Sequence, residues 1–159
     1  MDEKAKIEPI RFENAGPMLI AGLGQRYTGE SSKNIPLLWQ RFGPHIGNMA
    51  HQVGKIAYGV CYDADDNGNF DYLCGVQVSD FAALPEEFTR LRLTAQRYAV
   101  FAHRDHISTL RSTVKSIWGK WLPESKYQAA EAPNFERYGP EFDARTGNGG
   151  LEIWIPLKA

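Results

Sequence analysis

The hydrophobic positions along this chain predict several short strands and two helices. The strands are apolar runs rich in β-branched and aromatic residues, at 17–25, 55–62, 70–78, 96–103, 134–142 and 150–157. The helices have apolar residues at helical spacing, over 31–43 and 108–122. We expect Ser108 to cap the second helix at its N-terminus and Pro123 to end it.

Turn-forming segments join two pairs of the predicted strands. Residues 65–69 (DDNGN) and 146–150 (TGNGG) each lie between two apolar runs. Asn and Gly tolerate the positive φ values that tight hairpin turns need. Both pairs of strands are therefore predicted to form antiparallel hairpins.

The order strand, helix, strand, strand occurs twice, and local sequence matches indicate an internal duplication. Residues 58–64 and 138–144 both read Y-G-x-x-aromatic-D-A, at an offset of 80 residues. The same offset aligns the apolar residues 18–22 with 98–102. The predicted fold is α+β: duplicated β-α-β-β units form a curved antiparallel sheet, with two helices on one face and a groove between them.

We expect the whole chain, residues 1–159, to be a single ligand-binding domain. One repeat is predicted over 8–78 and the other over 94–159. The segment 79–93 between them is predicted to be a linker, part of which could pair as an edge strand.

Composition and charge narrow the classes of function. The chain has 159 residues, of which 43% are hydrophobic and 23% charged, which is ordinary for a globular domain. Its 18 Lys and Arg against 19 Asp and Glu leave no basic surplus, so direct DNA binding is not expected. We find neither a signal-peptide pattern nor an apolar run of about 18 residues, which predicts a cytoplasmic protein without membrane association.

The cysteines and histidines do not form a disulfide or metal-binding pattern. Cys61 and Cys74 lack the CxxC spacing and are expected to be reduced, half-buried thiols. His103 and His106 form a pair where a strand ends, for which a capping or solvated role is favoured over metal binding. We expect no metal and no cofactor.

An apolar groove is expected where two helices fail to cover a strongly twisted sheet. Aromatic residues are abundant on the elements that would border it. The candidates for its lining are Trp39, Tyr58, Tyr72, Phe101, Trp118 and Tyr138. For any one of them a place in the core is the simpler explanation.

Glu136 interrupts the apolar pattern of its predicted strand. Strand alternation places Glu136 and Tyr138 on one face and Phe135 and Arg137 on the other. Two orientations stay open, toward solvent or toward the groove. In the groove the carboxylate would be costly without a partner. It would suit an organic cation, to which each aromatic face adds about 0.5–2 kcal/mol.

Four segments of the second half, in this order, are YAVFAH at 98–103, WLPESKY at 121–127, PNFERY at 133–138 and EIWIP at 152–156. Together they resemble the GyrI-like domain. This is the effector-binding domain of AraC-type and MerR-type multidrug-responsive transcription regulators, and it also occurs as stand-alone proteins. The resemblance covers residues 96–157, and the first half matches mainly through the duplication.

The resemblance implies the duplicated fold and a groove between the helices. It further implies that the acid of the F-E-x-Y motif, here Glu136, pairs with cationic aromatic ligands, with Tyr138 beside it. Trp39, Tyr58 and Tyr72 are added from the pseudo-symmetry of the two halves.

The chain departs from the family in two respects. Family members often read H-x-G-P-Y where this chain has HRDHI at 103–107, which changes the loop at the rim of the groove. The regulators also carry a DNA-binding helix-turn-helix. Only a short charged segment precedes residue 17, so the chain is not expected to be a complete regulator of that type.

Three functions are open at this stage. The favoured one is a stand-alone effector-binding module for a small cationic aromatic or amphipathic molecule, in transcription regulation or in drug or toxin sequestration. A second is a hydrolase with Glu136 as general acid or base. No second acid and no Ser/His/Asp set supports it, so an enzyme is not favoured.

The third function is a protein partner role, as an inhibitor or modulator of DNA gyrase. The acidic group Asp63, Asp65, Asp66 and Asp71 could then mimic nucleic acid. A solvated hairpin tip explains the same residues more simply.

Overall fold

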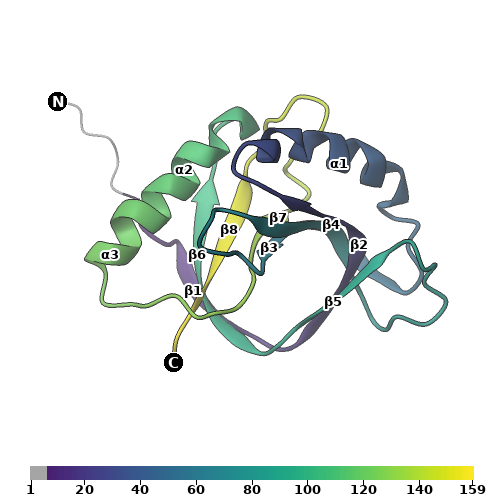
Figure 1. Ribbon diagram of the computed structural model, residues 1–159, viewed down its shortest axis with the longest axis horizontal. Helices are drawn as coiled ribbons and strands as arrows, with labels where there is room; N and C mark the ends of the chain where they lie inside the picture. Colours follow the sequence, from purple (N-terminus) through teal and green to yellow (C-terminus); the bar gives the residue numbers. More distant parts are fainter. Residues whose placement is uncertain (1–6) are drawn as a thin grey trace.

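The computed structural model describes residues 7–159. Its eight strands form one antiparallel sheet, in the order β1-β6-β8-β7-β3-β4-β2-β5. The strands are β1 Arg11–Ala15, β2 Met18–Tyr27, β3 Gln52–Tyr62, β4 Phe70–Val78, β5 Thr89–Leu93, β6 Gln96–His103, β7 Asn134–Tyr138 and β8 Leu151–Leu157. The helices are α1 Ile35–Phe42, α2 Leu110–Ser116 and α3 Leu122–Glu124. Figure 1 shows α1 and the α2–α3 run on the same side of the sheet. The predicted fold class is confirmed.

Each helical region is longer than its α-helix, because other helical turns extend it. The 3-10 turns Ser31–Asn34 and Gly43–His45 flank α1, so the helix predicted over 31–43 is confirmed in extent. The second region begins with the 3-10 turn Ile107–Thr109 and contains a π-helical turn, Ile117–Trp121, between α2 and α3. None of the helices described over residues 7–159 is both long and apolar enough to cross a membrane.

Both ends of the second helical region differ from the prediction. His106, rather than Ser108, is the N-cap, because its Nδ1 accepts the backbone N–H of Ser108 at 3.0 Å. The run also continues past Pro123 to Glu124. Pro123 lies at the start of the last helical turn, where a residue without an N–H is tolerated.

The predicted strands are present, with one that is shorter than expected. β7 ends at Tyr138 instead of residue 142. Gly139 and Pro140 follow it, and a proline cannot donate to the strand ladder. The strand β1 was not predicted, whereas β5 lies in the predicted linker and pairs at the edge of the sheet.

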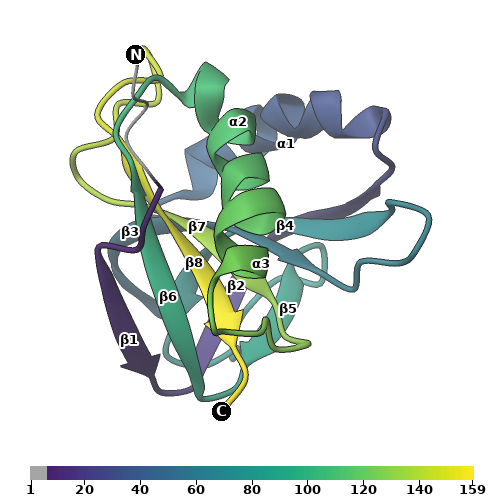
Figure 2. The same cartoon turned by 90° about the vertical axis from the view of Figure 1, so that its left-hand side faces the viewer.

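The two edge strands are exchanged between the halves. β1, which precedes β2, pairs with β6 of the second half, and β5, which precedes β6, pairs with β2 of the first. Figure 2 views the edge formed by β1, next to β6 and β8. Strands β3 and β7 meet at the centre of the sheet, with Gly59 opposite Glu136.

The two faces of the sheet carry separate hydrophobic cores. One core under α1 contains Leu38, Phe42, Tyr72 and Val76, and another under α2 contains Phe101, Ile117, Ile153 and Ile155. A third core fills the opposite face and includes Ile20, Leu93, Tyr98, Val100 and Phe135, which come from distant strands of the sheet. The sheet therefore curls around this third core into a half-barrel. On the helical face the two cores are separate, and the β3–β7 pair runs between them.

Candidate ligand-binding site

Glu136 lies on β7 at the centre of the sheet and faces the helices. Its neighbour Phe135 is 2% exposed in the core of the opposite face. Arg137 also points to that side, where its Nη1 lies 3.7 Å from Oε1 of Glu152. Of the two orientations left open by the sequence, the structure has the one toward the groove.

Two tyrosine hydroxyls converge on the carboxylate of Glu136. Tyr138 of β7 donates to its Oε1 at 2.7 Å, and Tyr72 of β4 donates to the same atom at 3.0 Å. Trp39 of α1 donates from Nε1 to the hydroxyl oxygen of Tyr72 at 3.0 Å. The four residues form one connected network in which Trp39 and Tyr72 come from the first half and Glu136 and Tyr138 from the second.

The second carboxylate oxygen of Glu136 differs from the first. The side-chain hydrogen bonds that Glu136 forms within residues 7–159 end on Oε1. No buried side-chain nitrogen or oxygen in this part of the chain lacks a partner. Since Oε2 has no partner there, it must keep contact with solvent. Glu136 thus has one oxygen fixed by the protein and a second to which no group of residues 7–159 donates.

Gly59 leaves the space that the network occupies. A Cβ at this position would collide with the hydroxyl of Tyr72 and lie 2.8 Å from Oε1 of Glu136. Glycine is therefore required by close approach, and not by a turn. Gly59 was not among the residues proposed from the sequence, although it belongs to the repeated Y-G-x-x-aromatic-D-A segment.

The site is a low-dielectric environment, which shifts the pKa values of its titratable groups. Burial raises the pKa of Glu136, and the hydrogen bonds from Tyr138 and Tyr72 offset this only in part. Burial, and then the charge of Glu136, raises the pKa of Tyr72 and Tyr138 well above the usual value. Both tyrosines therefore remain protonated hydrogen-bond donors at neutral pH.

Aromatic rings surround the carboxylate on the side of the helices. The ring of Trp39 lies edge-on to Tyr138, with centroids 5.2 Å apart, and Phe142 lies 4.9 Å from Tyr138. Trp118 is half-buried and packs against the core under α2, as Tyr138 does. Phe142 was not among the residues proposed from the sequence, because residues 134–142 were predicted to form one strand, whereas β7 ends at Tyr138 and Phe142 lies in the loop after it.

Two aromatic residues proposed from the sequence lie elsewhere. Tyr58 is 5% exposed in the core of the opposite face, 5.5 Å from the ring of Phe135. It pairs across the strands with Arg137 and so has the opposite phase of alternation from Glu136. Phe101 is fully buried under the second helical region, 4.9 Å from Trp121. The structure brings neither of them to the network around Glu136.

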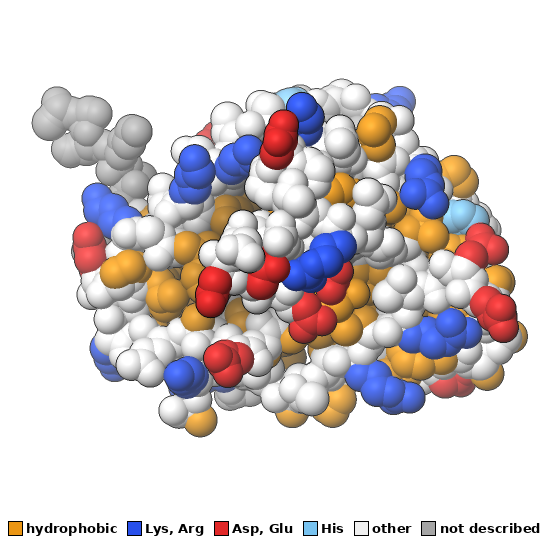
Figure 3. All heavy atoms as spheres, viewed as in Figure 1, with side chains coloured by type: hydrophobic (Ala, Val, Ile, Leu, Met, Phe, Trp, Pro, Cys, Tyr) orange, Lys and Arg blue, Asp and Glu red, His pale blue; other side chains and the backbone are white. Residues whose placement is uncertain are grey.

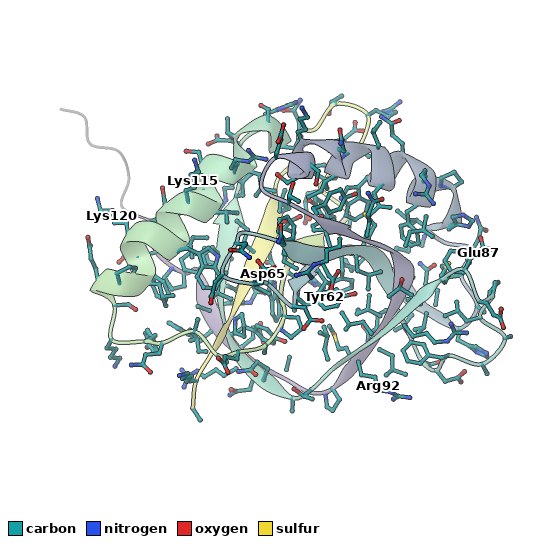
Figure 4. The ribbon with its side chains drawn as sticks, viewed as in Figure 1. Tyr62, Asp65, Glu87, Arg92, Lys115 and Lys120 are labelled. Carbon is teal, nitrogen blue, oxygen red and sulfur yellow. The ribbon has the colours of Figure 1, made fainter. Side chains whose placement is uncertain are left out.

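A hydrophobic recess borders the hairpin between β3 and β4 (Figure 3). Figure 3 shows hydrophobic surface in a recess between the α2–α3 run and this hairpin, and Figure 4 labels Asp65 and Tyr62 on the hairpin side. Asp65 accepts backbone N–H groups of Asn67 and Asn69, at 2.8 and 3.0 Å. Arg26 pairs with Asp65 at 3.1 Å. The acidic residues here organise a hairpin tip.

The HRDHI segment holds the loop at 146–147 next to the start of the second helical region. His103 is 2% exposed, and its Nδ1 lies 2.7 Å from the hydroxyl of Thr113 on α2. His106 donates from Nε2 to the carbonyl of Thr146 at 2.7 Å, since its Nδ1 is an acceptor. These histidines are structural groups. In the described part of the chain, no three His, Cys, Asp or Glu side chains gather to form a metal site.

The chain is 28% identical over 138 residues to the transcriptional regulator BrlR of Pseudomonas aeruginosa. The match covers 85% of the chain and 51% of BrlR, so the chain spans about half the length of this curated relative.

Two solved structures share the fold at low sequence identity. SAV2435 bound to tetraphenylphosphonium has a TM-score of 0.75 at 18% identity, over 94% of this chain and 93% of the other. The C-terminal domain of EcmrR has a TM-score of 0.63 at 15% identity, over 93% and 96%. The profile of the GyrI-like small molecule binding domain matches residues 8–158. The chain therefore belongs to the GyrI-like small-molecule-binding domain family.

Proposed function

We propose that this domain binds a small organic cation with aromatic groups, in the groove between α1 and α2, and that Glu136 is the counter-ion. One observation carries the proposal: Oε1 of Glu136 is held by Tyr72 and Tyr138, while Oε2 is unpartnered and in contact with solvent. A partly buried carboxylate with a free oxygen is stabilised by a ligand cation, because the ion pair compensates for the water that the carboxylate loses on burial.

The aromatic surroundings favour a bulky cation over a metal ion or a compact ammonium. The rings of Trp39 and Tyr138 are in edge-on contact with each other, and both residues belong to the hydrogen-bonded network of the carboxylate. Each suitably placed ring adds about 0.5–2 kcal/mol to the binding of a cation. Trp118 is proposed to supply the wall on the side of α2. Tetraphenylphosphonium, to which SAV2435 is bound, has this combination of charge and aromatic surface.

The titratable neighbours of Glu136 in the described structure include no ionised nucleophile. They are Tyr72, Tyr138, Cys61 and Cys74. Burial, and then the charge of Glu136, raises the pKa of both thiols, so neither is a thiolate nucleophile at neutral pH. The role that we propose for Glu136 is therefore to bind a cation, and not to activate either thiol.

The biological role that we propose is that of an effector-binding module in the cytoplasm, whose occupancy is passed on to transcription. The support is the similarity to BrlR, a transcriptional regulator, of which the chain matches 51%.

Isothermal titration calorimetry with tetraphenylphosphonium tests the proposal. We expect saturable binding to the wild type and a loss of about 10- to 100-fold in affinity with Glu136→Gln, which removes one charge-assisted contact. The matched control is Glu87→Gln, at an exposed position that Figure 4 shows far from the groove. Equal affinity for wild type and Glu136→Gln would contradict the proposal.

A further inference from the structure

Trp39 contacts both tyrosines that hold Glu136. Its Nε1 donates to the hydroxyl oxygen of Tyr72 at 3.0 Å. Its ring meets that of Tyr138 edge-on at 5.2 Å, with an interplanar angle of 71°. Trp39 itself lies on α1, outside the sheet that carries the other three residues. One side chain of the helix therefore touches both donors of a carboxylate on the central strand pair.

The direction of the hydrogen bonds follows from the donor chemistry of Trp39. An indole N–H can only donate, so the hydroxyl oxygen of Tyr72 must accept. The single proton of that hydroxyl is then left for Oε1 of Glu136, which is 3.0 Å away. The chain of donors runs one way, from Trp39 through Tyr72 to the carboxylate. Bonds in such a chain polarise one another, so the first strengthens the second.

We infer that Trp39 is a positioning residue: by orienting the Tyr72 hydroxyl toward Oε1 it keeps Glu136 ionised and leaves Oε2 as the oxygen that receives a cation. The inference rests on the proposed function, because this positioning matters only if Glu136 binds a ligand. It goes beyond that function by assigning to a residue of α1 the control of the protonation state of Glu136.

The groups that face Glu136 are few in the described structure. Tyr138 and Tyr72 donate to it, and Trp39 acts through Tyr72. The thiols of Cys61 on β3 and Cys74 on β4 are close enough for the charge of Glu136 to raise their pKa. Tyrosines and thiols with raised pKa values are neutral in the range where Glu136 titrates. A change in its titration therefore reports on hydrogen bonding.

The titration of Glu136 in the ligand-free protein tests the inference. Glutamate is labelled with 13C at the side-chain carboxyl, and the signal of Glu136 is assigned by its loss in Glu136→Gln. Trp39→Phe keeps an aromatic ring and removes the N–H. We expect its titration midpoint to rise by roughly half a pH unit, which is the scale of one weakened hydrogen bond. The control Trp121→Phe removes a half-buried indole that packs against Phe101 and Tyr127, away from the network, and should leave the midpoint unchanged.

A double-mutant cycle separates positioning from packing. In a Tyr72→Phe background the link between Trp39 and Glu136 is already cut, so adding Trp39→Phe should not move the midpoint further. A midpoint in Trp39→Phe equal to that of the folded wild type overturns the inference. So does a shift of the same size in the Tyr72→Phe background.

A second arm measures the affinity of tetraphenylphosphonium against pH. In Trp39→Phe the fall in affinity on acidification should begin at a higher pH than in the wild type. An equal loss of affinity at every pH, with an unchanged midpoint, means that Trp39 only packs, and it also overturns the inference. If the wild type does not bind tetraphenylphosphonium, the proposed function fails, and the carboxyl titration still decides the role of Trp39.

Discussion

Tyr138 donates a hydrogen bond of 2.7 Å to Glu136, two residues earlier on the same strand. Side chains at this spacing share one face of a strand, so β7 supplies both the acid and its strongest neutral partner. Tyr72 reaches the same oxygen from β4 at 3.0 Å. Residues from both halves of the duplicated fold therefore form hydrogen bonds with each other at one atom, Oε1 of Glu136.

Removing either tyrosine hydroxyl should weaken the ionised form of Glu136. We expect Tyr138→Phe to raise the pH at which Glu136 titrates more than Tyr72→Phe does, because its bond is shorter. Each variant should also lower the free energy of unfolding by about 0.5–1.5 kcal/mol. Carboxyl NMR titration and urea denaturation measure the two effects. A larger shift in Tyr72→Phe would contradict the order of the two donors.

Glu136→Gln should make the domain more stable at neutral pH while it loses ligand binding. Burial raises the pKa of Glu136 in the folded state above its unfolded value. The protonated acid therefore favours folding at pH values below the unfolded pKa, and this contribution is lost as the pH rises through the folded pKa. Glutamine keeps an acceptor without the charge, and we expect a gain of about 0.5–2 kcal/mol at pH 7.5.

The control for this prediction is how the difference in the free energy of unfolding between Glu136→Gln and the wild type changes with pH. The gain from Glu136→Gln, measured by urea denaturation, should shrink as the pH falls from neutral toward 4. A difference that is constant with pH would mean that Glu136 has the same pKa in the folded and unfolded states.

Gly59→Ala should disrupt the site from the neighbouring strand. The added methyl group would collide with the Tyr72 hydroxyl and crowd Oε1 of Glu136. We expect a loss of about 1–3 kcal/mol in the free energy of unfolding and weaker binding of tetraphenylphosphonium. Gly16→Ala is the matched control, since a Cβ at Gly16 meets nothing within 4 Å. Equal stability of the two variants would show that the sheet has more room at Gly59 than the structure gives it.

Arg11 should anchor the exchanged strand β1 to the second half. Its guanidinium donates to both oxygens of Glu152 on β8, at 2.9 and 3.1 Å. We expect Arg11→Ala to cost about 1 kcal/mol, because the ion pair is only partly buried. The control is Arg145→Ala, whose side chain is 90% exposed. Faster hydrogen exchange confined to β1 and its partner β6 is the expected signature, and unchanged exchange there would contradict this role.

The pH dependence of the Arg11 contact has the opposite sign from that of Glu136. Burial of Glu152 opposes its ionisation, but hydrogen bonds from Arg11 and Trp154 outweigh this and lower its pKa. The stability that it contributes is present above the unfolded pKa and is lost as the pH falls through the folded value. The effect of Arg11→Ala on unfolding should therefore diminish in acid.

Local patterns in the sequence predicted the elements but not all of their partners. Apolar runs and turn residues found β2, β3, β4, β6, β7 and β8, and the repeated segment predicted the duplication. β1 was missed because RFENA is short, with two charged residues among its five, and because its partner β6 is more than 80 residues away. The exchange of edge strands between the halves depends on tertiary pairing, so a short stretch of sequence cannot predict it.

The candidate site was predicted in part for a similar reason. Alternation fixes which residues share a face with Glu136, and it predicted Tyr138 correctly as its neighbour. Tyr58 was proposed from pseudo-symmetry, but it pairs with Arg137 and faces the opposite core, so it lies outside the network. Trp39 and Tyr72 were proposed from pseudo-symmetry and lie in the network. Gly59 was missed because the absence of a side chain leaves no chemical signal in a sequence.

The most direct test of the central claim is a crystal structure of the domain with tetraphenylphosphonium. We predict that the cation lies in the groove, with its phosphorus nearest to Oε2 of Glu136 and its phenyl rings against Trp39 and Tyr138. Oε1 should keep its hydrogen bonds to Tyr72 and Tyr138. A cation bound elsewhere on the domain, with Glu136 still open to solvent, would contradict the account.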